Sequence, residues 1–225
     1  MQKLTSAILV SGGSDSAILT THLLKKYPSV LPIYVRSGHI WEDAELFWLK
    51  HFLRAIRNPR IKALKVLSLE TRDLYQNHWS ITGKKIPGAK SHDEKVYLPG
   101  KNLLLISKAA VFCSLTKIPY LALAPLKTNP FPDAHPSFFK SIEKTCSKGL
   151  NFKLRMLTPF LNKSKQEVMK LGRNLPLELT FSCLAPQTVK GLTHRYIHCG
   201  RCNKCAERKK AFRNAKLIDR TYYAN

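Results

Sequence analysis

The chain is short of acidic residues and has no long apolar run. Its 225 residues contain 14 Asp and Glu against 38 Lys and Arg, so the formal charge is +24 with histidine neutral. No stretch approaches the roughly 18 apolar residues of a membrane-spanning helix. The apolar run from Ala7 to Val10 is too short for the core of a signal peptide. We therefore expect a protein that does not span a membrane and that resides in the cytoplasm.

Cysteine is too scarce for a disulfide scaffold, and two common nucleotide-binding motifs are missing. Only six cysteines are present, and four of them fall in the last 43 residues, which points to a metal site. Gly100-Lys101 is followed by Asn102, so there is no Walker A motif, and the dinucleotide fingerprint G-x-G-x-x-G does not occur. Hydrophobic residues make up 44% of the chain, which is typical of a folded globular protein.

The excess of positive charge leaves several partner classes open. A basic chain can bind nucleic acid, an acidic membrane surface or phosphorylated small molecules. Lysine and arginine are spread along the whole chain without a separate basic arm. The charge is compatible with nucleic-acid contact, but a solvated basic surface is the simpler interpretation.

Apolar runs and helical spacing alternate along the chain. Buried strands are expected at 6–10, 31–35, 62–69 and 120–126. Helices are expected from 17 to 27, over 41–56 and 102–115, from about 136, and after the capping-box pair Ser164 and Glu167. The polar, Gly- and Pro-containing stretch from 70 to 100 is typical of a long functional loop. This alternation predicts an α/β fold, with a parallel sheet flanked by helices in a domain at 1–180 and a small cysteine-rich segment at 181–225.

The segment Ser11-Gly12-Gly13-Ser14-Asp15-Ser16 joins the first strand to the first helix. Two glycines let the backbone turn with positive φ, and the N–H groups and the helix N-terminus then favour an anion. We expect this turn to bind phosphate, with Asp15 holding a magnesium ion or capping the helix. An ordinary glycine turn with a serine cap is the alternative.

The C-terminal cysteines have the spacing of a metal site. Cys199, Cys202 and Cys205 are separated by two residues each, and Cys183 precedes them. Four thiolates can close a tetrahedral zinc site with a structural role. An iron–sulfur cluster and unliganded reduced cysteines remain alternatives, because short spacing alone does not separate them. We expect His194 and His198 at the surface and Cys113 in the core.

The string Ser11 to Ser16 resembles the S-G-G-x-D-S signature of the PP-loop ATP pyrophosphatases. Together with further segments, the chain resembles the 7-cyano-7-deazaguanine synthase family, called QueC. These segments are Pro99-Gly100-Lys101-Asn102, Phe131-Pro132-Asp133, Ser164-Lys165-Gln166-Glu167, Thr180-Phe181-Ser182-Cys183, and His198-Cys199-Gly200-Arg201-Cys202-Asn203-Lys204-Cys205. The resemblance implies a PP-loop fold of the adenine nucleotide alpha hydrolase type and spans nearly the whole chain.

Four features depart from the family pattern. The segment from Val35 to Glu42 differs from the usual Y-G-Q-R-H string. Lys101 replaces an arginine, which keeps the charge but loses the planar two-point contact with an anion. Phe131 lacks the hydroxyl of a tyrosine, and residues 187–196 form an insertion. We expect these departures to affect which acyl substrate is bound more than they affect the transfer of AMP from ATP to that substrate.

The resemblance implies an ATP-dependent carbon–nitrogen ligase that converts 7-carboxy-7-deazaguanine and ammonia to 7-cyano-7-deazaguanine. The implied cofactors are ATP, Mg²⁺ and structural Zn²⁺, and the family resemblance suggests a homodimer. The implied residues are Asp15, Lys101 and Lys165 for catalysis; Val10, Ser11, Gly12, Gly13, Ser14, Asp15 and Ser16 for ATP; Pro99, Gly100, Asn102, Phe131 and Asp133 for substrate; and Cys183, Cys199, Cys202 and Cys205 for metal. Helix capping by Asp133 or Asn102, and an exposed position for Lys165, are the alternative roles.

Two other activities keep the same phosphate site. In one, the acceptor is a tRNA base and sulfur is the nucleophile. In the other, a relative of the synthase attaches a deazaguanine group to a macromolecule. Zinc in the purified protein favours the synthase, whereas iron with labile sulfide favours tRNA thiolation.

Overall fold

Five parallel strands form the central sheet of the computed structural model, which describes residues 5–189 and 195–224. The strands are β1 (Ser6–Leu9), β2 (Val30–Arg36), β3 (Lys65–Ser68), β4 (Tyr120–Ala122) and β5 (Arg155–Leu157). Their order is β3-β2-β1-β4-β5, so the chain turns back between β1 and β4. In parallel sheets, ligands bind beyond the carboxyl ends of the strands at such a reversal. The predicted parallel α/β fold is confirmed.

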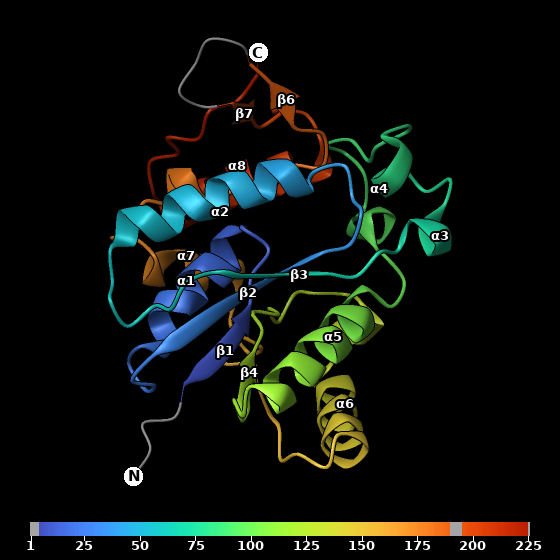
Figure 1. The fold of residues 1–225 in the computed structure, drawn as a ribbon. Helices are drawn as coiled ribbons and strands as arrows, with labels where there is room; N and C mark the ends of the chain where they lie inside the picture. The colour runs from blue at the N-terminus through green and yellow to red at the C-terminus, as the bar shows by residue number, and fades with distance from the viewer. Residues whose placement is uncertain (1–4, 190–194, 225) are drawn as a thin grey trace.

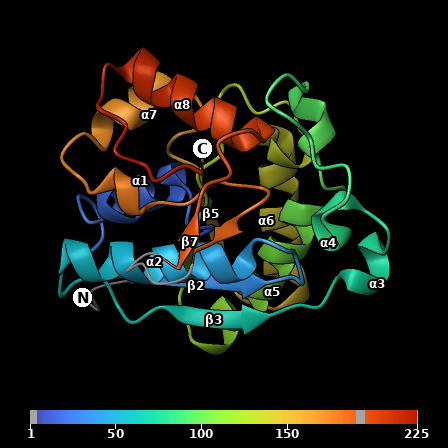
Figure 2. The ribbon, with the colours of Figure 1, turned by 90° about the horizontal axis from the view of Figure 1, so that it is seen from above.

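Helices cover both faces of this sheet (Figure 1). On one face lie α5 (Lys101–Leu115) and α6 (Pro136–Gly149). On the other lie α1 (Ser14–Leu23), α2 (Glu42–Ile56), α7 (Lys165–Leu171) and α8 (Asn203–Ala215), and the view in Figure 2 shows α8 beside α7. The predicted capping box at Ser164 and Glu167 is present at the start of α7.

The stretch expected to be a long loop contains short elements. It includes α3 (Arg72–Tyr75), α4 (Trp79–Thr82) and the 3₁₀ turn η1 (Asp93–Val96). Two further 3₁₀ turns are η2 (Pro132–Ala134) and η3 (Leu177–Leu179), and β6 (Gln187–Thr188) pairs antiparallel with β7 (Tyr196–Ile197). Four residues suffice for one turn of helix, which is too short to show a period in the sequence.

The cysteine-rich segment packs into the main core. Phe212 and Ala215 of α8 are buried in the same cluster as Ile18 of α1 and Val168 of α7. The division of the chain after residue 180 stays a prediction. Within the described ranges, no helix has both the length and the apolar character needed to cross a bilayer.

Candidate functional site

The Ser11–Ser16 turn, which is predicted to bind phosphate and is called the phosphate turn below, is held between α2 and the C-terminal segment. Gly12 has φ +77°, and a Cβ atom at this position would lie 3.0 Å from the carbonyl oxygen of Glu45, so a side chain would be both strained and crowded. The N–H of Phe181 donates to the carbonyl of Gly12 at 2.8 Å. The hydroxyl of Ser16 donates to the carbonyl of Gly13 at 3.1 Å. These contacts hold the backbone conformation of the turn, which joins the end of β1 to the start of α1.

Asp15 and Lys165 meet at this turn. The Nζ atom of Lys165 lies 2.8 Å from both carboxylate oxygens of Asp15 and 3.2 Å from the hydroxyl of Ser14. The N-cap of α1 is Gly13, so the alternative role of Asp15 as a helix cap is wrong. Lys165 is also not a freely exposed lysine, because its side chain is only 23% exposed. The structure therefore brings two of the three predicted catalytic residues into contact.

A cavity of about 390 Å³ opens beside the turn, within the usual range for a small-molecule site. Most of the predicted catalytic, nucleotide and substrate residues line it: Val10, Ser11, Gly13, Ser14, Asp15, Ser16, Lys101, Asn102, Phe131, Asp133 and Lys165. Of the predicted residues, Gly12, Pro99 and Gly100 are not among the described residues that line it. Gly100, at φ +72°, is the N-cap of α5, and the carbonyl of Pro99 accepts from the hydroxyl of Tyr75 at 2.8 Å. Both residues position the start of α5.

Asp133 is joined to the first turn of α5. One carboxylate oxygen of Asp133 accepts from the backbone N–H of Asn102 at 2.9 Å, and the Asn102 side chain donates to the Asp133 carbonyl at 3.0 Å. Asp133 is 8% exposed, and burial raises the pKa of its carboxyl group, against the opposing effect of these hydrogen bonds. The N-cap of α6 is His135. Asp133 is therefore not the N-cap of α6 and Asn102 is not the N-cap of α5, although the Asp133 carboxylate accepts an N–H group of the first turn of α5.

Aromatic rings surround the predicted substrate residues. Phe131 stacks on Tyr97 with ring centroids 4.9 Å apart, and the Nζ atom of Lys101 lies 5.5 Å from the ring of Trp41. All four residues line the cavity. A planar heterocycle can stack on such rings while a lysine faces its anionic substituent.

Several residues of the cavity were missed in the sequence. His39 is 6% exposed and stacks on Trp41 at 4.8 Å, and neither ring nitrogen has a hydrogen-bond partner among the described residues. Burial lowers the pKa of His39 to about 3. Tyr34 donates to Glu45 at 2.8 Å, and burial raises the pKa of Glu45 to about 8. The departure of residues 35–42 from the family pattern is a sequence signal for His39, but it does not include Tyr34 or Glu45.

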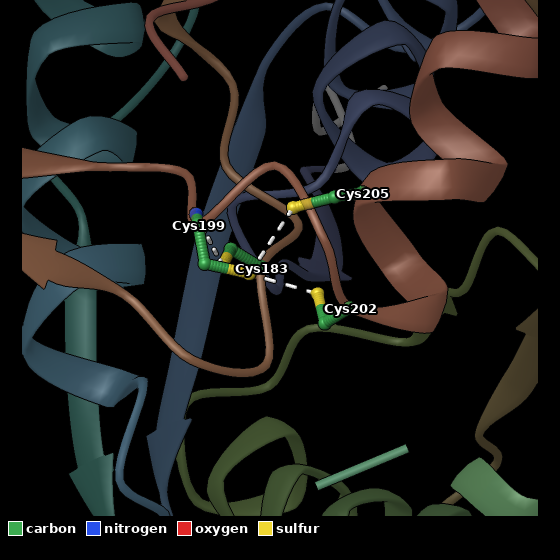
Figure 3. Close-up of side chains that lie close together, drawn as sticks. All are labelled: Cys183, Cys199, Cys202 and Cys205. Carbon is green, nitrogen blue, oxygen red and sulfur yellow. Dashed lines mark hydrogen bonds between the residues drawn. The ribbon is translucent and has the colours of Figure 1, made fainter. Parts of the chain in front are cut away.

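The four C-terminal cysteines converge on one point (Figure 3). Their sulfur atoms all lie within 4.8 Å of one another, and all four residues are buried. Backbone N–H groups point at the sulfurs: Cys199 donates to Cys183 at 3.2 Å and Leu184 donates to Cys202 at 3.4 Å. N–H donors stabilise thiolates. Four cysteine thiolates leave no open coordination position on the metal, which suits a structural zinc ion. The residues present therefore fit the predicted metal.

The cysteine cluster also anchors the segment before α5. The N–H of Asn203 donates to the carbonyl of Pro87 at 2.9 Å, its side chain donates to Ser91 at 2.9 Å, and Ala89 donates to Arg201 at 3.0 Å. This segment continues through Val96 to Leu98, which line the cavity. A bound metal would thereby support the cavity wall, to which Cys183 itself contributes.

The expected surface position of His198 is wrong. Its side chain is 1% exposed, packs on Phe181 at 4.3 Å, and accepts a hydrogen bond from the N–H of Ser182 at 3.2 Å. Burial lowers the pKa of His198 to about 2. His194 lies outside the described residues. Cys113 is fully buried in the core, as predicted.

The family model that matches this chain agrees with its curated relatives. The family model "Queuosine biosynthesis protein QueC" matches residues 5–216. A 7-cyano-7-deazaguanine synthase of Methanococcus maripaludis (strain DSM 14266) is 32% identical over 96% of this chain and 97% of its own length. That of Leptospira interrogans (strain Fiocruz L1-130) is 27% identical over 96% of this chain and 89% of its own length. The crystal structure of a predicted subunit of tRNA methyltransferase from Methanocaldococcus jannaschii has a TM-score of 0.47 and 18% identity to this chain, covering 75% of each chain.

Proposed function

Since the chain belongs to the QueC family of queuosine biosynthesis proteins, we propose that it converts 7-carboxy-7-deazaguanine, ammonia and ATP to 7-cyano-7-deazaguanine. The predicted family is thereby confirmed, and with it the prediction of an enzyme. One observation carries the detailed proposal. The phosphate turn with Asp15 and Lys165, and the Asn102–Asp133 pair, line the same cavity, so a nucleotide and an acyl substrate can meet there.

The proposed reaction uses ATP twice. First, the substrate carboxylate attacks the α-phosphorus of ATP, pyrophosphate leaves, and ammonia then displaces AMP from the acyl carbon to give an amide. Second, the amide oxygen attacks the α-phosphorus of another ATP, and loss of AMP and protons leaves the nitrile. Both activations convert an oxygen into a leaving group, and the protein contributes mainly positioning and electrostatic stabilisation.

The Ser11–Ser16 turn and two lysines would contact the phosphates of ATP. The Ser11–Ser16 turn would bind the triphosphate, and Lys165 and Lys101 would neutralise charge that develops during adenylation. Mg²⁺, when bound with ATP, shields the phosphate oxygens, and Asp15 is the residue that would hold it. Lys165 is then free to contact phosphate instead of Asp15.

The acyl substrate would lie against the Asn102–Asp133 pair. A deazaguanine ring presents N–H donors on one edge, and the buried carboxylate of Asp133 is an acceptor for them. Phe131 would pack against the ring. The four cysteines would hold Zn²⁺ in a structural role.

The test is product analysis. Purified protein incubated with 7-carboxy-7-deazaguanine, ATP and ammonium should yield AMP, the amide and the nitrile by mass spectrometry, and Asp15→Ala should abolish all three. Exposed Asp73→Asn is the matched control. Absence of AMP, amide and nitrile with the wild-type protein would overturn the proposal.

The proposed partners are ATP, ammonia and the heterocyclic acid, and the proposed location is the cytoplasm. A homodimer and nucleic-acid contact stay predictions that the reaction does not require. Light scattering tests the first, and salt-dependent retention on tRNA tests the second.

A further inference from the structure

Five carboxylates line the cavity, and four of them already have cationic or N–H partners. The partnered four are Asp15 with Lys165, Glu42 with the N–H groups of Ser37 and Gly38, Asp133 with Asn102, and Glu207 with Lys204. The fifth is Glu45. Within the described residues its carboxylate forms no ion pair and accepts no N–H, and its one hydrogen bond is from the hydroxyl of Tyr34 at 2.8 Å.

Glu45 is placed next to the nucleotide turn. It lies one turn into α2, and its own carbonyl oxygen faces Gly12 so closely that a Cβ there would be 3.0 Å away. Tyr34, on β2, is 2% exposed and donates to one carboxylate oxygen. The other carboxylate oxygen is left for a molecule in the cavity. Glu45 also lines the cavity that opens beside the Ser11–Ser16 turn, so a molecule bound at the turn shares this cavity with the Glu45 carboxyl group.

A nitrogen substrate that arrives as ammonium needs a carboxylate to bind it and to remove its proton. The cavity is also lined by the cationic side chains of Lys101, Lys165, Lys204 and Arg208, which repel ammonium. Because the other four carboxylates already have partners, Glu45 is the one left to bind it.

The groups that face Glu45 leave it suited to proton transfer. Burial raises its pKa to about 8, while Lys101 from α5 and the Tyr34 hydroxyl oppose this and Glu42 reinforces it. A base with a pKa close to the operating pH transfers protons most effectively.

We propose that Glu45 is the general base that binds ammonium and accepts its proton before nitrogen attacks the adenylated carboxyl carbon. An N–H bond of ammonium breaks and its proton moves to the free oxygen of Glu45. The nitrogen lone pair then forms the C–N bond, and the C–O bond to AMP breaks with its electron pair leaving on AMP. A second nitrogen proton and the Glu45 proton pass to water. This step rests on the proposed function.

Glu45→Gln separates this step from adenylation, because exchange of pyrophosphate into ATP needs the carboxylate substrate but no nitrogen. Glutamine can still accept from Tyr34 at the same position. We expect exchange close to the wild-type rate and amide formation from ammonium lowered by about 100-fold to 10,000-fold. With hydroxylamine, which is mostly neutral near neutral pH, the variant should form hydroxamate at close to the wild-type rate.

Two further variants complete the experiment. Glu45→Asp keeps a carboxylate and should retain more ammonium-dependent activity than Glu45→Gln. Asp43→Asn, at an exposed position on the same helix, should leave both steps unchanged. Wild-type ammonium activity in Glu45→Gln would overturn the proposal, as would equal losses with ammonium and hydroxylamine or a loss of exchange. Absence of exchange in the wild-type protein would instead overturn the proposed function.

Discussion

Lys165 donates to both carboxylate oxygens of Asp15, at 2.8 Å each, although 150 residues separate the two in the chain. The contact joins the first turn of α7 to the first turn of α1 at the phosphate turn. The N-terminus of α1 carries partial positive charge and the Lys165 side chain adds a full positive charge, so both stabilise an anion placed here. Without nucleotide, Lys165 therefore pairs with Asp15. When ATP and Mg²⁺ bind, we expect Lys165 to contact phosphate and Asp15 to contact Mg²⁺.

Replacing Lys165 tests its role toward phosphate. Lys165→Met removes a positive charge aimed at the developing negative charge, and we expect pyrophosphate exchange to fall by about 100-fold to 1,000-fold. Lys170→Met, at an exposed position on the same helix, is the control and should exchange like the wild type. Equal exchange in the two variants would remove Lys165 from the mechanism.

Replacing Asp133 tests the substrate side of the cavity. Asp133→Asn keeps the size of the side chain but loses the charge that would accept from ring N–H groups. Hydrogen bonds to a charged group contribute about 1.5 to 3 kcal/mol, so the KM for the heterocyclic acid should rise by about 10-fold to 100-fold. The KM for ATP should stay constant. A rise for ATP alone would place Asp133 on the nucleotide instead.

What the sequence predicts well depends on local signals. The strand, glycine turn and helix around the phosphate site, and the capping box of α7, each follow from residues within a few positions of one another. In contrast, β5 was not predicted. β4 is equally short, but it begins a longer apolar run at 120–126, whereas β5 contains Arg155 and has no such run around it. The short helices between 70 and 100 were missed because one turn is too short to show a period.

Residues that act through tertiary contacts were the ones missed or misplaced. His198 was expected at the surface, yet the packing of the C-terminal strand buries it against Phe181. Glu45 and His39 carry no motif, and their place in the cavity depends on how α2 and the loop after β2 lie over the sheet. The cysteine cluster was predictable because the spacing of its ligands is itself local.

The metal site gives a prediction about content and stability. Purified protein should contain about one zinc ion per chain, and Cys205→Ser should lose it. Because the metal ligands also anchor the segment at 87–91, the variant should melt at a lower temperature. Cys146→Ser, at a half-buried position outside the cluster, should keep the zinc. Iron with labile sulfide in the wild-type protein would contradict the zinc assignment.

The buried imidazole of His39 predicts a specific loss of stability in acid. Its pKa is about 3 in the folded chain against 6.5 for the free side chain, because burial disfavours the charged form. Below pH 6.5 the unfolded chain therefore takes up a proton that the folded chain does not, and the free energy of unfolding falls as the pH falls toward 3. Between about pH 6 and about pH 5 this loss should amount to about 1 kcal/mol.

His39→Phe isolates this effect, since phenylalanine can stack on Trp41 as His39 does and cannot be protonated. Urea unfolding at several pH values measures the free energy of unfolding of both proteins. The value for the variant minus that for the wild type should increase by about 1 kcal/mol for each pH unit that the solution becomes more acidic. His92→Phe, at an exposed position, is the matched control, and its gain should be smaller. Parallel stability curves for the wild type and His39→Phe would mean that the imidazole takes up its proton in the folded state, which requires an acceptor or water at the ring nitrogens.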